Sequence, residues 1–359
     1  MEPRRAIRRY AVAACLLVLV AQVAALVTLT HRETSEPHRV PIVIAAPAVV
    51  AQSLSDDADA LPADPFEASW TDDPAAARAA VRDGRAVAAV LVDLSETQDV
   101  VVVNARSDGD LNDAVTDRLA AVGKAQGRTL EVREIAQADA DGAAGRIRLV
   151  LLLCGLLGFG VTVAISLGRG PIARASGAEV MLRVGVVGAT SLVGAVLLQL
   201  LPVTRLPGSD VEVIALSAAY LLSLGLITLA AEMLAGLAGL AGVAAAYLVL
   251  ATPLLSGTSY YLLPMPWPVL TPRTPTGAAG QALAAVAYFD PGRAVSAALI
   301  LGAAVAVPLL VLMLGRSLRR RPPEASEDQP QPAMPVRHWR LWVLAAVLPL
   351  VAVTAVAVR

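Results

Sequence analysis

Residues whose types and spacing could support catalysis are scarce in this chain. The only lysine, Lys124, is followed by Ala125, and no G-x-x-x-x-G-K-[ST] loop occurs, so the chain has no P-loop for a nucleoside triphosphate. The three histidines, at 31, 38 and 338, lie outside the long apolar runs and form no H-E-x-x-H pattern, which argues against intramembrane zinc hydrolysis. We therefore expect no catalytic, cofactor-binding or metal-ligating residue, and any ATP would be hydrolysed by a partner.

One short stretch resembles the start of a calcium loop. Gln137, Asp139 and Asp141 place oxygen side chains at alternate positions before Gly142, which permits a sharp turn. The twelfth position of such a loop requires a bidentate Glu, but here it is Arg148. The pattern therefore favours a solvated turn over a calcium site.

Glu232 is the candidate intramembrane polar residue. Apart from Glu212 at the end of one run, it is the only acid amid the apolar runs of the C-terminal part. Such an acid is often a proton relay or the partner of an arginine. Because Glu232 stands where the chain is expected to turn between two runs, we favour a hydrated, interfacial side chain over a coupling residue.

Several glycines with small neighbours are candidates for close helix packing. Gly236, Gly239 and Gly242 are separated by Leu and Ala, and Gly185 and Gly188 form a second such set. Small residues let helix backbones approach closely in lipid, where the hydrophobic effect does not drive helices together. The pattern fits a packed bundle or a subunit interface, and both alternatives remain open.

The composition indicates a membrane protein. Of 359 residues, 56% are hydrophobic and only 16% are charged, and the net charge is -1. This balance argues against nucleic acid as a partner, because phosphate binding requires a concentrated basic surface. Basic residues are almost all Arg, and Ala and Val dominate the apolar set, which is typical of high-GC bacterial coding.

The first apolar run, Tyr10 to Thr30, is long enough to cross a bilayer as a helix. Four arginines precede it, so we expect residues 1–9 in the cytoplasm and residues 31–146 outside. An uncleaved anchor is favoured over a cleaved signal peptide because the apolar region is long. Six further spans are predicted at Leu149 to Leu167, Val180 to Leu201, Val211 to Leu229, Leu237 to Leu255, Ala294 to Leu314 and Leu341 to Val358.

Loop charges support this layout. Arg169 and Arg174 follow the second span, and a cluster of four arginines at 316 and 319–321 follows the sixth, which places both loops in the cytoplasm by alternation and by charge. The fourth and fifth spans should form a tight hairpin across residues 230–236. Residues 316–340, which include the Pro- and Glu-rich stretch 322–336, form a cytoplasmic linker to the last span.

Residues 31–146 differ in kind, since they carry most of the acids and only short apolar runs. Strands are predicted at 40–46, 87–92, 100–104 and 129–132, and helices at 74–82 and 111–122, which together indicate a small α/β layer. No disulfide is expected, because Cys15 and Cys154 would differ in depth by roughly 10 Å or more. The predicted fold class is thus an α-helical polytopic membrane protein of about seven spans, six plus an extra C-terminal one, with an inserted small α/β extracytoplasmic domain.

The segment 256–292 is too polar and proline-rich to cross the bilayer, but it carries several aromatic residues. Aromatic residues gather at membrane interfaces, so we expect short re-entrant or surface helices at the outer face. Its most distinctive part contains Leu263 and Pro264, then Gly277 and Gly280, and ends in Tyr288, Phe289, Asp290 and Gly292.

The order of these parts resembles the type 2 ABC transporter permeases, and specifically their phage-infection-protein-like branch. Within the outer domain, AAARAAVRDGRAVAAVLVD at 75–93 resembles the helix and strand of that branch, and EIAQADADGAAG at 134–145 resembles its acidic approach to the second span. The Y-F-D-x-G ending of the interfacial segment resembles it most closely. Members usually stop after six spans, so the span at 341–358 departs from the pattern.

This resemblance implies an export permease of the bacterial plasma membrane that forms a homodimer, or a heterodimer with a second permease, and is driven by a separate ATPase. Arg169 and Arg174 are then candidates for the loop that couples the bundle to the ATPase. A membrane-anchored receptor or scaffold acting through its outer domain is the alternative. Proton-coupled transport through Glu232 is a third hypothesis.

Overall fold

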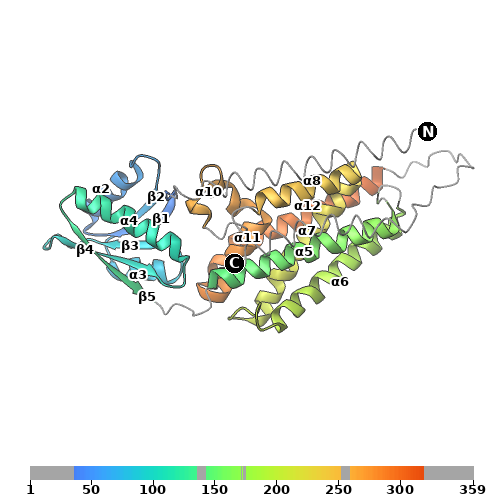
Figure 1. Cartoon of the computed structure of the whole chain (residues 1–359), viewed down its shortest axis with the longest axis horizontal. Coiled ribbons are helices and arrows are strands. Elements are labelled where there is room, and N and C mark those ends of the chain that lie inside the picture. The colour runs from blue at the N-terminus through green and yellow to red at the C-terminus, as the bar shows by residue number, and fades with distance from the viewer. Residues whose placement is uncertain (1–35, 136–142, 171, 173–174, 252–258, 319–359) are drawn as a thin grey trace, which may run out of the picture.

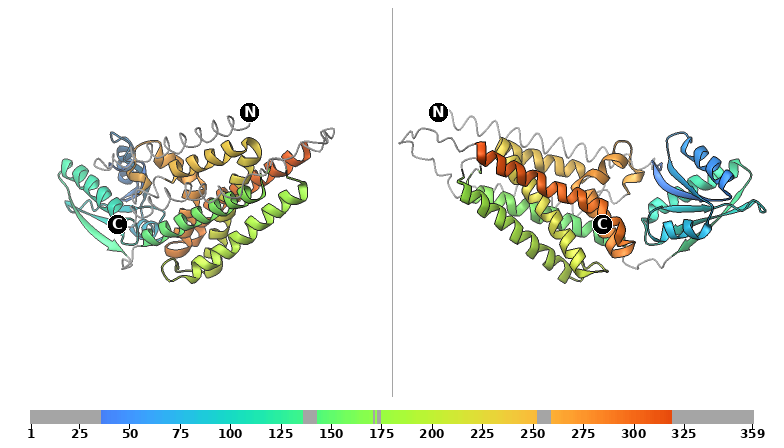
Figure 2. Two further views of the ribbon diagram at one scale, coloured as in Figure 1. Left: turned by 45° about the vertical axis from the view of Figure 1, so that its right-hand side comes forward. Right: turned by 180° about the vertical axis from the view of Figure 1, so that it is seen from behind.

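The computed structural model describes residues 36–135, 143–170, 172, 175–251 and 259–318. It consists of a sheet domain, residues 36–135, and a bundle of helices that begins at Ala143. The sheet domain lies beyond one end of the long axis of the bundle (Figure 1). Views from two other directions show the same arrangement (Figure 2).

The sheet domain is built on five strands in the order β2-β1-β3-β4-β5. Its strands are β1 (Val40–Ala45), β2 (Phe66–Thr71), β3 (Ala88–Leu91), β4 (Gln98–Asn104) and β5 (Thr129–Ile135). Only the β3–β4 pair is antiparallel, so the sheet is mixed. The nearly continuous apolar sequence of β1, β3 and β4 fits strands that are covered on both faces.

Helices cover both faces of the sheet. Helix α2 (Ala48–Asp59) and helix α4 (Gly109–Ala125) pack on one face, where Ile42, Phe66 and Val115 belong to one buried cluster. Helix α3 (Pro74–Arg82) packs its alanines on the other face. The domain is thus a three-layer α/β/α unit, and the predicted small α/β layer is confirmed at the level of a small mixed sheet with helices.

Two elements of this domain were missed from the sequence. Helix α2 begins after Pro47 without a side-chain cap and buries only Ala51 and Ser55, so it carries little of the 3.6-residue periodicity that reveals a helix. Strand β2 lies at the edge of the sheet, and only Phe66 among its six residues is fully buried. The sequence of α2 thus lacks a clear hydrophobic pattern, whereas β2 alternates Phe66, Ala68 and Trp70 with polar residues, a strand signal that was present and was missed.

The bundle contains four helices that are long and apolar enough to cross a membrane, by length and composition, among the residues that the structure describes. They are α5 (Ala143–Arg169), α6 (Gly177–Leu200), α7 (Asp210–Ala235) and α12 (Ala294–Leu318). Helix α8 (Leu237–Leu250) is apolar, but its 14 residues span only about 21 Å. The predicted spans at 10–30 and 341–358 and the end of the span at 237–255 lie outside the described residues. The described residues thus show four candidate spans, and the count of about seven stays a prediction.

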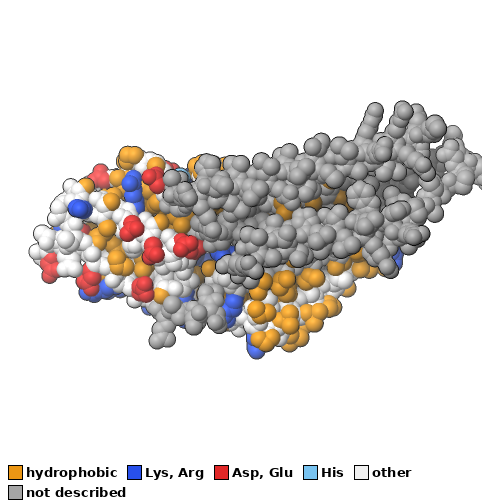
Figure 3. All heavy atoms as spheres, in the orientation of Figure 1, with side chains coloured by type: hydrophobic (Ala, Val, Ile, Leu, Met, Phe, Trp, Pro, Cys, Tyr) orange, Lys and Arg blue, Asp and Glu red, His pale blue; other side chains and the backbone are white. Residues whose placement is uncertain are grey.

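The outer surface of the bundle is apolar. Helix α6 exposes six large hydrophobic side chains, at 181, 182, 192, 193, 197 and 200. Figure 3 shows hydrophobic side chains gathered on the lower edge of the bundle, whereas acidic side chains gather on the sheet domain. A surface of this kind is stable in lipid, so the chain has the build of a helical membrane protein with a water-facing domain at one end.

The predicted hairpin between the fourth and fifth spans is tighter than expected. Helix α7 continues to Ala235, and Gly236 alone connects it to α8, with a φ of +60° that favours glycine. Glu232 therefore lies within a helix and not in a turn, because the residues around it are strong helix formers. Gly239 approaches the carbonyl of Ala231 too closely to carry a side chain, whereas a side chain at Gly242 would meet open space.

The segment 259–293 folds back into the bundle. It contains η3 (Tyr260–Leu262), α10 (Trp267–Leu270), η4 (Thr271–Arg273), α11 (Pro275–Tyr288) and η5 (Pro291–Arg293). Helix α11 is largely buried against α5, α7 and α12, and the hydroxyl of Thr276 lies 3.0 Å from that of Tyr220, ten residues into α7. We call residues 259–293 the re-entrant segment because α11 packs inside the bundle; whether it enters a bilayer or lies at its surface stays a prediction.

Candidate functional site

Two places in the structure connect helices of the bundle with one another or with the sheet domain. One is the connection between α5 and α6, residues 170–176, at the end of the bundle away from the sheet domain. The other is the re-entrant segment, where it meets the sheet domain. Most of the residues singled out from the sequence fall at one or the other.

Glu232 binds the α5–α6 connection from within α7. Its side chain is buried, with 3% of its surface exposed. One carboxylate oxygen accepts a hydrogen bond of 2.5 Å from the hydroxyl of Ser166 on α5, and the other accepts one of 3.1 Å from the backbone N–H of Ile172. The expectation of a hydrated Glu232 is therefore wrong, because the side chain is buried against Ser166 and Ile172. Its place at a membrane interface stays a prediction.

Arg183 holds the same connection from α6. It is 1% exposed, and its guanidinium donates to the backbone carbonyls of Gly170, at 2.9 Å, and Arg169, at 3.2 Å. It also donates to the carboxylate of Glu179, one turn earlier, at 2.7 Å. The C-terminal carbonyls of a helix lack intrahelical partners and carry partial negative charge, so a buried guanidinium at the end of α5 is favourably placed.

The two buried charges thus act on one short piece of backbone. Glu232 accepts a hydrogen bond from the backbone N–H of residue 172, and Arg183 donates hydrogen bonds to the backbone carbonyls of residues 169 and 170. Gly170 has a φ of +77°, which lets the chain leave α5 sharply between these two contacts. Leaving a buried charge without its partners costs free energy, so these contacts oppose any rearrangement of the connection.

The candidate coupling residues fall on this connection. Arg169 is exposed at the last residue of α5, and Arg174 lies outside the described residues. The structure thus places the backbone of Arg169 in the site, where its carbonyl binds Arg183. Its role in coupling stays a prediction.

At the other end of the bundle, the Y-F-D-x-G sequence contacts the sheet domain. The ring of Phe289 and the guanidinium of Arg293 lie against Gly84, in the turn between α3 and β3, and Arg293 donates to the carbonyl of Gly84. Gly84 has a φ of +71°, and a methyl group there would meet both side chains. Tyr288 is buried in the bundle, and Asp290 caps the short η5 by accepting from the N–H of Gly292 at 2.9 Å.

The start of the re-entrant segment makes a second junction. Leu262, 5% exposed, packs in the same buried cluster as Val40 and Phe66 of the sheet domain. The carbonyl of Tyr261 accepts a hydrogen bond of 2.9 Å from the N–H of His38, two residues before β1. Pro264 is exposed just beyond this junction. One re-entrant segment therefore reaches both the core of the sheet domain and the core of the bundle.

Sequence reasoning missed Arg183, although a signal was present. It stands within a predicted span, and a charged residue there marks a buried partner or a functional site. Leu262 and Arg293 carried no comparable signal, because each looks like an ordinary residue of an interfacial loop. Among the described residues, no group of three or more His, Cys, Asp or Glu side chains is arranged to hold a metal. The calcium-like stretch 137–142 lies outside them.

The arrangement defines a class, a helical membrane protein in which a re-entrant segment joins a mixed-sheet domain to the bundle. Comparison with known proteins goes no further, since no family model, no curated protein and no solved structure matches the chain.

Proposed function

We propose that this chain is the membrane-spanning permease subunit of an ATP-driven exporter, with ATP hydrolysed by a separate subunit. The observation that carries the proposal is the fixed α5–α6 connection, held by buried Glu232 and Arg183. A motor subunit transmits motion only through an element whose geometry is fixed relative to the helices it must move. A short connection that continues from α5 and is bound to α6 and α7 by buried charges meets that requirement.

A continuous path leads from this connection through the bundle. Glu232 and Tyr220 are both on α7, and Tyr220 contacts Thr276 of α11. Helix α11 leads directly to Phe289 and Arg293, which contact the sheet domain. Motion of α7 would therefore move the re-entrant segment, and with it the sheet domain.

The proposal also includes the orientation of the chain in the membrane. Exposed Arg169 is at the end of the bundle away from the sheet domain. Of the predicted cytoplasmic arginines, Arg174 follows α5 in the sequence, Arg316 lies in the last turn of α12, and 319–321 follow α12. Cytoplasmic loops carry an excess of arginine, so this end faces the cytoplasm of a bacterial cell, and the sheet domain faces outward.

A second permease, either another copy or a related chain, completes the pathway in this proposal. Gly185, Gly188 and Gly242 meet open space within the described chain, and α6 exposes a broad apolar surface. Small residues on a lipid-facing helix allow a second helix to approach closely. These glycines are thus available to a subunit interface.

Affinity purification of the tagged chain from its native membrane in mild detergent tests the proposal. We expect a P-loop ATPase at a stoichiometric ratio, lost on Arg169→Glu and retained on Arg205→Glu. Arg205 is the matched control, because it is an exposed arginine at the opposite end of the bundle. Repeated absence of an ATPase, with envelope proteins recovered instead, would favour a receptor or scaffold.

A further inference from the structure

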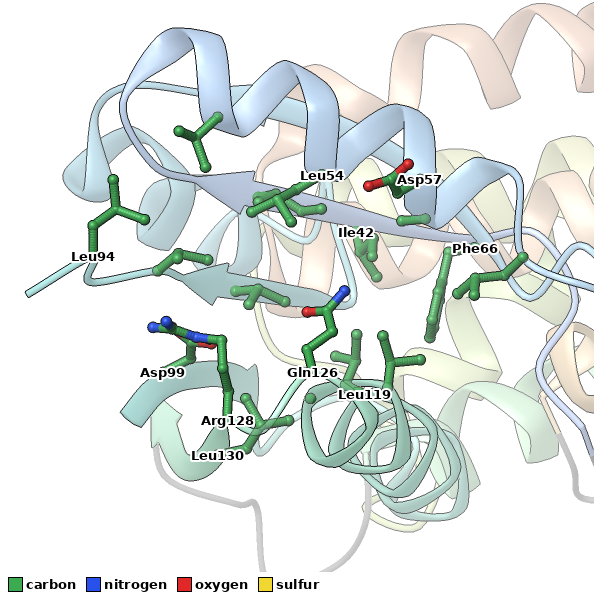
Figure 4. A pocket seen from close by; sticks show the side chains of 18 residues that line it. Ile42, Leu54, Asp57, Phe66, Leu94, Asp99, Leu119, Gln126, Arg128 and Leu130 are labelled. Carbon is green, nitrogen blue, oxygen red and sulfur yellow. The ribbon is translucent and has the colours of Figure 1, made fainter. Parts of the chain in front are cut away.

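The sheet domain contains a cleft that the exporter proposal does not use. It lies between α2 and α4 over one face of the sheet and has a volume of about 270 Å³ (Figure 4). Most of its lining is aliphatic, contributed by Ile42, Ile44, Leu54, Val90, Leu119 and Leu130. This volume approaches the lower end of the range, about 300–1,000 Å³, that small-molecule sites occupy.

The cleft exists because α2 does not close against α4. Helix α2 turns small side chains toward the sheet, and Ala51 and Ser55 are its only buried residues. On the other face, the alanines of α3 pack directly on the strands. An apolar space of this size binds water poorly, because water needs polar partners, and it accepts apolar ligands.

The polar groups of the cleft are few and carry a negative balance. The Asp99 carboxylate accepts two hydrogen bonds of 2.6 Å from the guanidinium of Arg128, so that pair is neutral as a whole. Asp57 on α2 forms no ion pair with any described residue, and Gln126 is neutral. Figure 4 shows Gln126 extending between the two walls. Figure 4 shows Asp57 toward Phe66 and away from Asp99 and Arg128. An anionic head group beside Arg128 would therefore find a cation that is already paired with Asp99.

The two ends of the cleft differ. Phe66 is at the end nearer the bundle and belongs to the buried cluster that also contains Leu262 and Tyr261 of the re-entrant segment. Leu94, Asp99 and Arg128 are at the opposite end, where β1 and β3 finish. The cleft therefore offers an apolar interior and a polar mouth away from the bundle, which favours entry from water over entry from the bilayer.

We propose that this cleft binds the aliphatic chain of a single-chain amphiphile that carries no negative charge and arrives from the aqueous side. The chain would lie along Ile42, Leu54 and Leu119 toward Phe66, with its head at the mouth near Gln126. Binding would reinforce the cluster that fixes Leu262, so occupancy would be sensed by the re-entrant segment. The site itself stands whether or not the chain is an exporter.

Photoaffinity labelling of the full chain in phosphatidylcholine nanodiscs tests this proposal. Three water-soluble probes share a ten-carbon chain with a terminal diazirine and differ in their heads, which are trimethylammonium, maltoside and sulfate. We expect the cationic and neutral probes to label peptides that contain Leu54 or Leu119, and the sulfate probe to label them at least fivefold less. A phosphatidylcholine with the same diazirine in one acyl chain tests entry from the bilayer and should not label them.

Two substitutions assign the labelling to the cleft. Ala58→Phe fills the cleft and should reduce labelling at least fivefold, whereas Ala76→Phe, at an exposed position on α3, should leave it unchanged. Gln126→Lys places a cation where the head group is proposed to lie, leaves the apolar interior intact and should reverse the preference between the cationic and the sulfate probe, which keeps the test valid if Ala58→Phe does not fold. Labelling that survives Ala58→Phe in a folded protein, equal labelling by all three heads, labelling by the lipid-borne probe alone, or no labelling of these peptides would overturn the proposal.

Discussion

At the scale of single residues, the bonds of Glu232 make a direct prediction. Glu232→Ala should loosen the α5–α6 connection, because the hydroxyl of Ser166 and the N–H of Ile172 lose a charged acceptor. A hydrogen bond to a charged group contributes about 1.5–3 kcal/mol, so opening should become roughly 10- to 100-fold more frequent. Hydrogen exchange of peptides that cover residues 169–176 in the full chain measures this change.

Glu212→Ala is the matched control, since Glu212 is an exposed acid at the other end of α7. Equal exchange in Glu232→Ala and the parent would show that the carboxylate does not hold the connection. Glu232→Gln separates this role from proton coupling. If transport fails in Glu232→Gln while exchange of the connection stays slow, a proton relay becomes the better account of Glu232.

Asp108 predicts a pH dependence in the sheet domain. Burial raises the pKa of Asp108 above its usual 3.8, and the nearby charge of Asp110 raises this pKa further, although Arg148 opposes the shift. Because the folded state holds this proton more tightly, the stabilisation it contributes is complete below about pH 3.8 and is lost as pH rises through the folded pKa.

Asp108→Asn should remove that loss. We will find the effect in the denaturant concentration at which β1 and β3 lose half of their protection from hydrogen exchange. As pH rises from about 3.5 to about 6, this concentration should fall less steeply in Asp108→Asn than in the parent. Asp113→Asn, at an exposed position on the same helix, should behave like the parent. Identical slopes in Asp108→Asn and the parent would contradict the inferred burial.

At the scale of elements, the sequence predicts those whose hydrophobic pattern is set locally. Strands β1, β3 and β4 and helices α3 and α4 each show the pattern of a covered strand or an amphipathic helix, and each was predicted. The edge strand β5 was predicted over 129–132, where Leu130 and Val132 alternate with polar residues. Helix α2 was not predicted, because a helix over a cleft buries too little to leave a clear pattern. Strand β2 was not predicted either, although Phe66, Ala68 and Trp70 alternate with polar residues as in a strand. The ends of the spans were predicted less well. A turn was expected at Glu232, but α7 continues to Ala235 and ends at Gly236.

The residues of the candidate site were likewise predicted only where the local sequence reveals them. Glu232 and Arg169 were recognisable as a charge within an apolar run and an arginine after one. Their partners were not, because Ile172 is 60 residues from Glu232 and the contact depends on how three helices pack. The packing glycines were also predicted in part: Gly239 approaches the backbone of Ala231, and Gly155, which was not singled out, meets Tyr247, whereas Gly242 meets open space.

Packing of α5 against α8 can be tested at Gly155. A methyl group there would overlap the hydroxyl of Tyr247, so Gly155→Ala should destabilise the bundle by about 1–3 kcal/mol. Thermal unfolding in detergent measures the effect, and Tyr247→Leu should restore part of the loss in the double variant. Gly160→Ala, which meets open space on the same helix, should cost little. If the two alanine variants unfold alike, α5 and α8 are not packed as described.

At the scale of the whole molecule, the question is whether the sheet domain and the bundle act as one unit. The contacts at Leu262 and Gly84 tie the re-entrant segment to the domain, and the contact of Tyr220 with Thr276 ties it to α7. An exporter whose outer domain takes part in transport needs such a link, whereas a receptor that uses the bundle only as an anchor does not. The link is therefore where the two functional hypotheses separate.

Leu262→Ala tests the link, because it removes a membrane-proximal side chain from the core of the sheet domain. Replacing a buried leucine by alanine costs about 2–5 kcal/mol, so β1 and β3 should exchange faster although they are far from residue 262 in sequence. Leu270→Ala, at an exposed position in the same segment, should leave this exchange unchanged. Under the exporter proposal, Leu262→Ala should also impair transport while the ATPase still co-purifies, since the docking end of the bundle is untouched. Full transport with a loosened sheet domain would instead mean that the domain works independently of the bundle, as a receptor would.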